Sequence, residues 1–358
     1  MAYRYFAQTL PGFGPIAWQE IRLKITAEQA AFRLGGRRND IVLFEYRGDP
    51  QRLWELRSTE DVFFLLQHIP SLSPGRAGLS QLLQEIRACP NLEAGLRIHR
   101  QLQRARTKRR TTFRVIVRKM GKHGFRRIDA QHAVEKGILQ RYDYAWKLVP
   151  EGGDLEIWVN LLGAEVIVGL RLSSKAMRHR AYKSAHLPAS LRPSAAFALA
   201  LLSKPTADDV FLDPFCGAGT ILIERALAGR YRLLLGGDID PQAIAVVRDN
   251  IGPRYKPIGI VRWDAGRLPL SGESVDRIVS NPPFGRRVGS HRENVRLYRQ
   301  FFAEVSRLLR HGGRLVLLTS ETRLVQDNLA QHPDLVPAEY HEVSVLGRPA
   351  TIYVLDRM

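Results

Sequence analysis

The chain of 358 residues has little cysteine and no long apolar run. Its two cysteines, Cys89 and Cys216, lie far apart, which argues against a disulfide framework and a cysteine-ligated metal site. No stretch of about 18 uninterrupted apolar residues is present, so we expect no conventional membrane span. The first residues lack the basic and then apolar order of a signal peptide. We therefore expect a globular, cytoplasmic protein without a metal ion.

Acidic residues are also scarce, because 35 aspartates and glutamates stand against 54 lysines and arginines, a formal net charge of +19. The excess is uneven: the segment from Arg97 to Arg127 holds thirteen lysines and arginines and no acid. A single charge run would usually be a solvated surface, but an excess of this size and placement attracts polyanions. We expect a nucleic-acid partner.

The N-terminal part, residues 1–58, has the pattern of a small α+β unit. A strand-like run at 3–10 is followed by a turn at Pro11 and Gly12 and by a helical pattern. A second strand is expected at 40–46.

A second α+β unit is expected over residues 59–172. The run VFFLLQHI, residues 62–69, is expected to be helical. Apolar and polar residues alternate in TTFRVIVRKM, residues 111–120, which predicts a half-buried strand. Two more strands are expected at 154–162 and 164–172.

Residues 173–190 are a basic linker, and the third part, residues 191–358, alternates apolar strands with helices. Strands joined by helices and short turns predict a parallel, doubly wound sheet that is covered on both faces. Two terminal strands would add an antiparallel edge. The expected fold class is therefore α/β, preceded by an α+β region.

The first strand of the third part ends in VFLDPFCGAGT, a strand followed by a glycine turn and a helix start. Gly217 and Gly219 permit the tight turn and let a ligand approach the backbone, while helix N–H groups point into the crevice. Ligands of such sheets bind beyond the carboxyl ends of the strands. A glycine turn alone suits any nucleotide or a purely structural corner.

Aspartates recur at the ends of the next two strands. Asp238 or Asp240, about twenty residues further on, can accept hydrogen bonds from both hydroxyls of a ribose. Asp264 can accept from an adenine amine, and Ala265 can offer its N–H to the ring. One such aspartate alone is more often a helix cap or a turn former. Their recurrence at successive strand ends favours a nucleoside ligand.

The fourth strand ends in NPPFG, residues 281–285. The two prolines remove two N–H donors, so this turn presents carbonyl oxygens. Asn281 adds a side-chain carbonyl and Phe284 an aromatic face, a set that suits a planar amine. Acceptors that draw the amine hydrogens out of conjugation favour in-line attack on a sulfonium methyl. The motif predicts methylation of an amine without a strong base.

In this order the motifs resemble those of class I S-adenosylmethionine-dependent methyltransferases that act on amines, over residues 191–320. Residues 59–183 resemble a THUMP domain, and residues 1–58 resemble the ferredoxin-like domain that precedes THUMP. The chain is thus similar to the THUMP-containing tRNA guanine-N2 methyltransferases that act at position 6. Archaeal enzymes of this kind that act at position 10 have aspartate in place of Asn281, which favours position 6.

The resemblance implies a Rossmann-like methyltransferase domain at 191–358, behind a THUMP domain at 59–172, with S-adenosylmethionine as the one cofactor. The residues implied for the methyl donor are Leu191, Asp213, Phe215, Gly217, Gly219, Asp238, Ile239, Asp264, Ala265 and Asn281. The residues implied for the target base are Asn281, Pro282 and Phe284.

The resemblance also implies that basic residues clamp the acceptor stem and 3′ end of tRNA by contacting phosphates. These residues are Arg104, Arg106, Lys108, Arg109, Arg110, Lys119, Lys122, Arg126, Arg127, Arg180 and Arg286. A helix with Arg100, Arg104 and Lys108 on one face would belong to the clamp, and HRENVRLYR would line the rim of the crevice. A paired guanine would have to flip out of the stem.

Other functions stay open on the residues alone. A turn of the NPPF type also serves guanine at tRNA position 10 or in ribosomal RNA, adenine, and the glutamine amide of proteins, although the charge of +19 disfavours a protein substrate. A non-catalytic RNA-binding protein that kept the fold is the alternative of another class. We expect no obligate protein partner.

Overall fold

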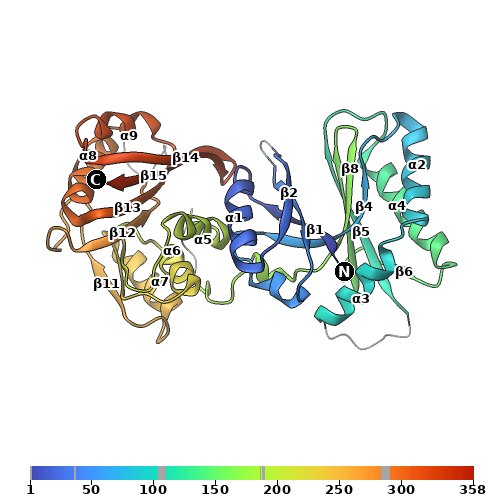
Figure 1. Ribbon diagram of the computed structural model, residues 1–358, viewed down its shortest axis with the longest axis horizontal. Helices are drawn as coiled ribbons and strands as arrows, with labels where there is room; N and C mark the ends of the chain where they lie inside the picture. The colour runs from blue at the N-terminus through green and yellow to red at the C-terminus, as the bar shows by residue number, and fades with distance from the viewer. Residues whose placement is uncertain (1, 36–37, 104–109, 186, 188–189, 284–290) are drawn as a thin grey trace.

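The computed structural model describes the chain except for residues 1, 36–37, 104–109, 186, 188–189 and 284–290. The described residues form two sheets. Figure 1 shows each sheet in its own lobe, with α1 (Gly14–Ile25) between the two. None of the described helices is both long and apolar enough to cross a bilayer.

The first sheet has eight strands in the order β2-β3-β1-β4-β8-β7-β5-β6. Their bounds are β1 (Tyr3–Thr9), β2 (Glu28–Arg33), β3 (Asp40–Tyr46), β4 (Asp61–Ile69), β5 (Thr112–Met120), β6 (Lys147–Leu148), β7 (Leu155–Leu162) and β8 (Glu165–Arg171). Strand β1 pairs antiparallel with both β3 and β4. Hydrogen bonding is therefore continuous from the N-terminal unit into the next, and the division at residue 58 stays a prediction.

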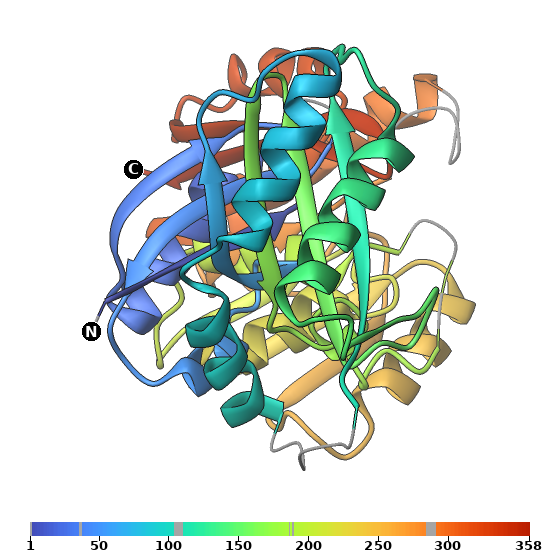
Figure 2. The same cartoon turned by 90° about the vertical axis from the view of Figure 1, so that its right-hand side faces the viewer.

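Helices cover one face of this sheet, as Figure 2 shows for α2 (Gly75–Arg87) and α4 (Arg127–Arg141). The helix α3 (Leu92–Gln103) contributes to the same core. The alternation predicted for β5 is confirmed, because Phe113, Val115 and Val117 are all buried in this core. The connections include two short 3-10 helices, η1 (Pro50–Glu55) and η2 (Lys175–Met177).

The prediction of a helix at 62–69 is wrong, because this segment belongs to the strand β4. Its two faces are both buried: the Phe63 ring stacks on Phe6, and the Phe64 ring meets Tyr5 edge to face. The first five residues of the run, VFFLL at 62–66, have no polar interruption and hence no period, so a strand buried on both faces resembles a buried helix in sequence. The strand β2 was not expected at all.

The second sheet has seven strands in the order β11-β10-β9-β12-β13-β15-β14. Their bounds are β9 (Val210–Asp213), β10 (Leu233–Asp238), β11 (Ile258–Arg262), β12 (Val275–Ser280), β13 (Leu309–Thr319), β14 (Leu335–Val345) and β15 (Arg348–Arg357). The first five are parallel, and β15 joins β13 and β14 antiparallel. This confirms the expected doubly wound sheet with an antiparallel edge.

The described residues of this part also form the helices α5 (Pro193–Leu202), α6 (Thr220–Ala228), α7 (Pro241–Ile251), α8 (His291–Leu308) and α9 (Thr322–Leu329). The strand β9 has β10 on one side and β12 on the other, so the direction of winding reverses beside it. Such a reversal opens a crevice at the carboxyl ends of the strands.

The two lobes meet through α1 and through buried charges. Phe13 and Ile16 share a hydrophobic core with Leu199 of α5. The Arg57 guanidinium donates to both carboxylate oxygens of Glu224, at 2.6 and 3.0 Å, and Glu224 is fully buried. The Tyr182 hydroxyl donates to the same carboxylate at 2.6 Å. Packing and charge pairing together hold the N-terminal unit against the second sheet.

Candidate functional site

A cavity of about 990 Å³ lies at the crevice beside β9. The β9–α6 turn, the residues after β10 and β11, the turn after β12 and one side of α8 all contribute to its wall. Of the residues expected to contact a methyl donor, all except Gly219 line it. They are Leu191, Asp213, Phe215, Gly217, Asp238, Ile239, Asp264, Ala265 and Asn281.

The two glycines of the β9–α6 turn serve different purposes. Gly217 lines the cavity with a positive φ of 49°, and an added Cβ there would meet no atom within 4 Å. Gly219 has a φ of 77°, and its Cβ would lie 2.4 Å from the Val247 side chain. Gly217 thus gives the turn its conformation at the cavity, whereas Gly219 allows α6 and α7 to pack closely.

Asp213, at the end of β9, is a fully buried carboxylate in the cavity wall. Its Oδ1 accepts the Ser280 hydroxyl at 2.7 Å and the Phe215 N–H at 3.3 Å. Its Oδ2 has no hydrogen-bond partner among the described residues. Burial raises the pKa of Asp213 to about 7, and the negative charge of Asp238 adds to the rise. A cation that reached this oxygen would stabilise its charged form.

The structure separates the two aspartates that follow β10. Asp240 caps α7, because its side chain accepts the Gln242 N–H at 2.8 Å. Asp238 accepts the Gly217 N–H at 3.1 Å on one oxygen and the Asp240 N–H at 3.1 Å on the other. Each oxygen of Asp238 keeps a further acceptor position. Asp238 therefore suits a diol better than Asp240 does.

The residues after β10 and β11 form one end of the cavity. Asp264 accepts the Gly266 N–H at 2.8 Å, which closes a tight turn, and Ala265 lines the cavity beside it. The Trp263 indole donates to the Pro214 carbonyl at 3.2 Å and ties this turn to the end of β9. Ile239 also lines the cavity and is 62% exposed. It offers an apolar surface to a planar ring.

The turn after β12 contributes Asn281 to the wall of the same cavity. The Oδ1 atom of Asn281 is buried and has no hydrogen-bond partner among the described residues. Pro283 lines the cavity, whereas the expected Pro282 is buried beside it and does not. Phe284 and Arg286 lie outside the described residues.

The helix α8 forms a further wall, as expected for HRENVRLYR. Glu293, Asn294 and Arg296 line the cavity, together with Leu297 and Gln300. Ser280 and Asn250 were missed in the sequence, because a buried serine or asparagine carries no motif by which it would be noticed. Both hold cavity residues through hydrogen bonds.

The described members of the expected RNA-binding set lie in separate parts of the structure. Arg110 is exposed before β5, and its Nε donates to the Ala145 carbonyl at 3.0 Å. The other end of β5 carries a second group, Lys119, Lys122, Arg126 and Arg127. A strand of nine residues separates these groups by roughly 25 Å. Arg104, Arg106, Lys108 and Arg109 lie outside the described residues, so the helix expected to extend to Lys108 is not described past Gln103.

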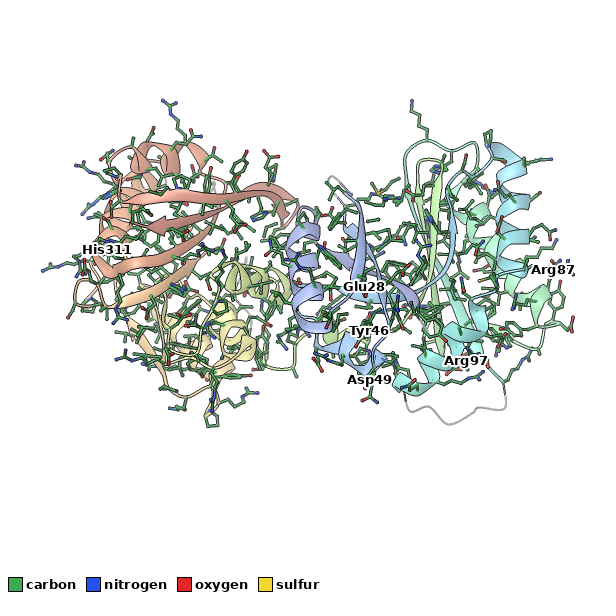
Figure 3. The ribbon with its side chains drawn as sticks, in the orientation of Figure 1. Glu28, Tyr46, Asp49, Arg87, Arg97 and His311 are labelled. Atoms are coloured by element: carbon green, nitrogen blue, oxygen red, sulfur yellow. The ribbon has the colours of Figure 1, made fainter. Side chains whose placement is uncertain are left out.

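Arg180 lies apart from both groups. Its guanidinium donates to the Arg57 carbonyl at 3.3 Å, between the two lobes, and burial lowers its pKa. Figure 3 shows Arg97, at the start of the basic segment, in the lobe of the first sheet, and His311 at the opposite end of the molecule. The described residues of the basic segment, in α3, β5 and the start of α4, therefore belong to the lobe of the first sheet.

A doubly wound sheet with an antiparallel edge and a cavity at its reversal point fits a class I S-adenosylmethionine-dependent methyltransferase domain. Residues 180–347 match the family model described as RMKL-like, methyltransferase domain.

Two relatives and one solved structure identify the family. A tRNA (guanine(6)-N2)-methyltransferase of Thermus thermophilus is 32% identical over 249 residues, which cover 69% of this chain and 73% of that protein. The mouse tRNA (guanine(6)-N(2))-methyltransferase THUMP3 is 34% identical over 262 residues, covering 68% of this chain and 51% of the relative. The crystal structure of TrmN from Thermus thermophilus matches all of both chains with a TM-score of 0.80 at 25% identity.

The chain therefore belongs to the family of the tRNA guanine-N2 methyltransferases. It spans about half the length of the mammalian relatives that it matches, those of mouse, cow and human.

Proposed function

We propose that this protein transfers a methyl group from S-adenosylmethionine to N2 of a guanosine in tRNA, at position 6 of the acceptor stem. One observation carries the proposal: Asn281, whose buried Oδ1 has no hydrogen-bond partner among the described residues, lines the same cavity as Asp213 and Asp238. The cavity thus offers acceptors for a cationic nucleoside and, beside them, an acceptor for an amine. The names of the Thermus and mouse relatives support guanosine at position 6.

On the donor side, we assign each polar group to the part of S-adenosylmethionine that its chemistry fits. The unpartnered Oδ2 of Asp213 receives the ammonium group, and Asp238 accepts the ribose hydroxyls. Asp264 and Ala265 hold the adenine edge, while Ile239 covers its face. When bound, the donor supplies a sulfonium-activated methyl group.

On the acceptor side, Asn281 accepts one hydrogen of the guanine N2 amine, and carbonyls of the proline turn accept the other. The two acceptors hold N2 so that its lone pair is out of conjugation with the ring and points toward the methyl carbon. The bond from N2 to the methyl carbon forms as the bond from sulfur to carbon breaks, and N2 then releases one hydrogen to water as a proton. Asn281 aligns the amine and needs no charge.

The tRNA approaches along the lobe of the first sheet. Arg110 at one end of β5 and Lys122, Arg126 and Arg127 at the other contact phosphates of the acceptor stem and 3′ end. The target guanosine leaves the stem and enters the cavity, a step that costs a few kcal/mol and is offset by contacts with the pocket. The protein needs no obligate partner for this reaction.

The test uses three versions of one unmodified tRNA transcript, with guanosine, inosine or adenosine at position 6. Inosine is guanosine without the N2 amine, so it is a matched control for the reacting atom. After incubation with S-adenosylmethionine, nuclease fragments are mapped by mass spectrometry. We expect N2-methylguanosine at position 6 of the first transcript and no methylation at that position in the other two.

Methylation of the adenosine transcript at position 6 would contradict guanine specificity. A methyl group found at another guanosine, such as position 10, in all three transcripts would contradict the assignment of position 6. No transfer to any transcript, with donor binding intact, would favour a non-catalytic RNA-binding protein.

A further inference from the structure

Asn250 is a buried polar residue near the end of α7, outside the groups assigned above. Its side chain is 0% exposed. Its Nδ2 donates to the Ala218 carbonyl at 2.9 Å and to the Ala185 carbonyl at 3.1 Å. Its Oδ1 accepts the Ala185 N–H at 3.0 Å and the Ser184 hydroxyl at 3.4 Å. Both amide hydrogens and both acceptor positions of the oxygen are therefore in use.

These bonds join two separate parts of the cavity wall. Ala218 lies in the β9–α6 turn and lines the cavity. Ala185 lies in the segment from Lys183 to Leu191, here called the connector, of which residues 183–185, 187 and 190–191 are described. Leu187, Ser190 and Leu191 line the cavity as well. Asn250 therefore links the connector to the turn that carries Gly217.

A hydrogen bond also links the two ends of the connector, and the connector contains the buried hydroxyl group of Ser190. The Lys183 ammonium donates to the Leu191 carbonyl at 2.6 Å, which brings the two ends of the connector together. The Ser190 hydroxyl oxygen is buried and has no hydrogen-bond partner among the described residues. A small shift of the connector would move this hydroxyl relative to Gly217 and Asp213.

Packing alone does not explain an asparagine here. The other buried side chains of α7 are apolar: Ala243, Ile244, Val247 and Ile251. An apolar residue at position 250 would form the helix more readily and would bury no polar group. The Asn250 amide is useful because it makes hydrogen bonds with backbone groups of both the connector and the β9–α6 turn.

We infer that Asn250 is a positioning residue for the methyl donor. It fixes the connector at one distance from the β9–α6 turn, so that the cavity has its binding shape before the donor arrives. The inference rests on the proposed function, because it takes the occupant of the cavity to be S-adenosylmethionine. Loss of Asn250 weakens donor binding and leaves tRNA binding and the transfer step unchanged.

The test variant is Asn250→Asp, which keeps the shape and the acceptor oxygen but removes both amide donors. We expect the Kd for S-adenosylmethionine, measured by calorimetry, and its KM to rise at least about tenfold. At saturating donor, kcat and the KM for tRNA should stay near the wild-type values.

Asn328→Asp is the matched control in the same domain. Asn328 is 5% exposed, and its Nδ2 donates to the Leu324 carbonyl at 2.7 Å within α9. The same chemical change there should lower thermal stability without changing the KM for the donor. An equal change of donor KM in both variants, or a fall in kcat alone for Asn250→Asp, would overturn the inference.

If Asn250→Asp does not fold, Ala185→Pro removes the N–H that Asn250 accepts and leaves the core of α7 intact. We expect a donor Kd raised by about threefold, and an unchanged Kd would overturn the inference. Wild-type calorimetry separates the two proposals. Wild-type protein that does not bind S-adenosylmethionine contradicts the proposed function, whereas binding that Asn250→Asp does not weaken contradicts only the role of Asn250.

Discussion

The substitution Asp213→Asn tests the electrostatics of the cavity through the pH dependence of stability. Burial raises the pKa of this carboxyl group from its ordinary value of 3.8 to about 7. The folded protein therefore holds this proton more tightly than the unfolded chain does. The resulting stability is fully present below the unfolded pKa and is lost as the pH rises through the folded pKa. The asparagine variant has no carboxyl proton at this position, so its stability does not fall in this way as the pH rises.

The expected size follows from the two pKa values. Between pH 5 and the folded pKa of about 7, each pH unit removes about 1.4 kcal/mol of wild-type stability, or about 3 kcal/mol in total. For a domain of this size, that corresponds to roughly 6 to 12 °C in Tm. The new amide nitrogen takes the place of Oδ2, which has no partner among the described residues. Burying this amide lowers the stability of the variant by the same amount at both pH values.

The assay is thermal unfolding of the donor-free wild type and of Asp213→Asn, at about pH 5 and about pH 8. We expect the variant to gain Tm relative to the wild type on going from the lower to the higher pH. An equal difference between the two proteins at both pH values would show that Asp213 is charged throughout, and would refute the reasoning.

Two further variants test the donor site and the RNA surface. Asp238→Ala removes the acceptor proposed for both ribose hydroxyls and should raise the donor Kd at least about 100-fold in calorimetry; wild-type affinity would refute the ribose assignment. Replacing Lys122, Arg126 and Arg127 by glutamine should weaken tRNA binding and flatten the dependence of log K on log salt by about 0.7 to 0.9 for each phosphate that is no longer neutralised. An unaltered slope would place the RNA elsewhere.

The sequence was sufficient to predict the second sheet because its strands and turns carry local signals. The strands that build the site end at, or just before, a residue with a polar or turn function, such as Asp213, Asp238 or Asn281, and carboxyl ends of parallel strands meet at one edge. This geometry alone brings residues from distant parts of the sequence into one cavity. Asp238 could not be separated from Asp240, since only the structure shows that Asp240 caps α7.

The first sheet was harder to predict because its identity depends on pairing between distant strands. The run at 62–66 has no period, and only its place between β1 and β8 explains why it is extended. The continuity of the sheet from β3 through β1 to β4 has no local signal either. Asn250 illustrates the same limit within the site, because its partners lie 65 and 32 residues away in the sequence.

The turnover of Asn281→Ala is the most direct test of the central claim, that an acceptor after β12 holds the amine that is methylated. The assay measures methyl transfer to tRNA at saturating S-adenosylmethionine, together with the Kd for tRNA. We expect a loss of kcat of at least about a hundredfold, with tRNA affinity within a few fold of the wild type. A variant that transfers methyl groups at the wild-type rate would contradict the claim.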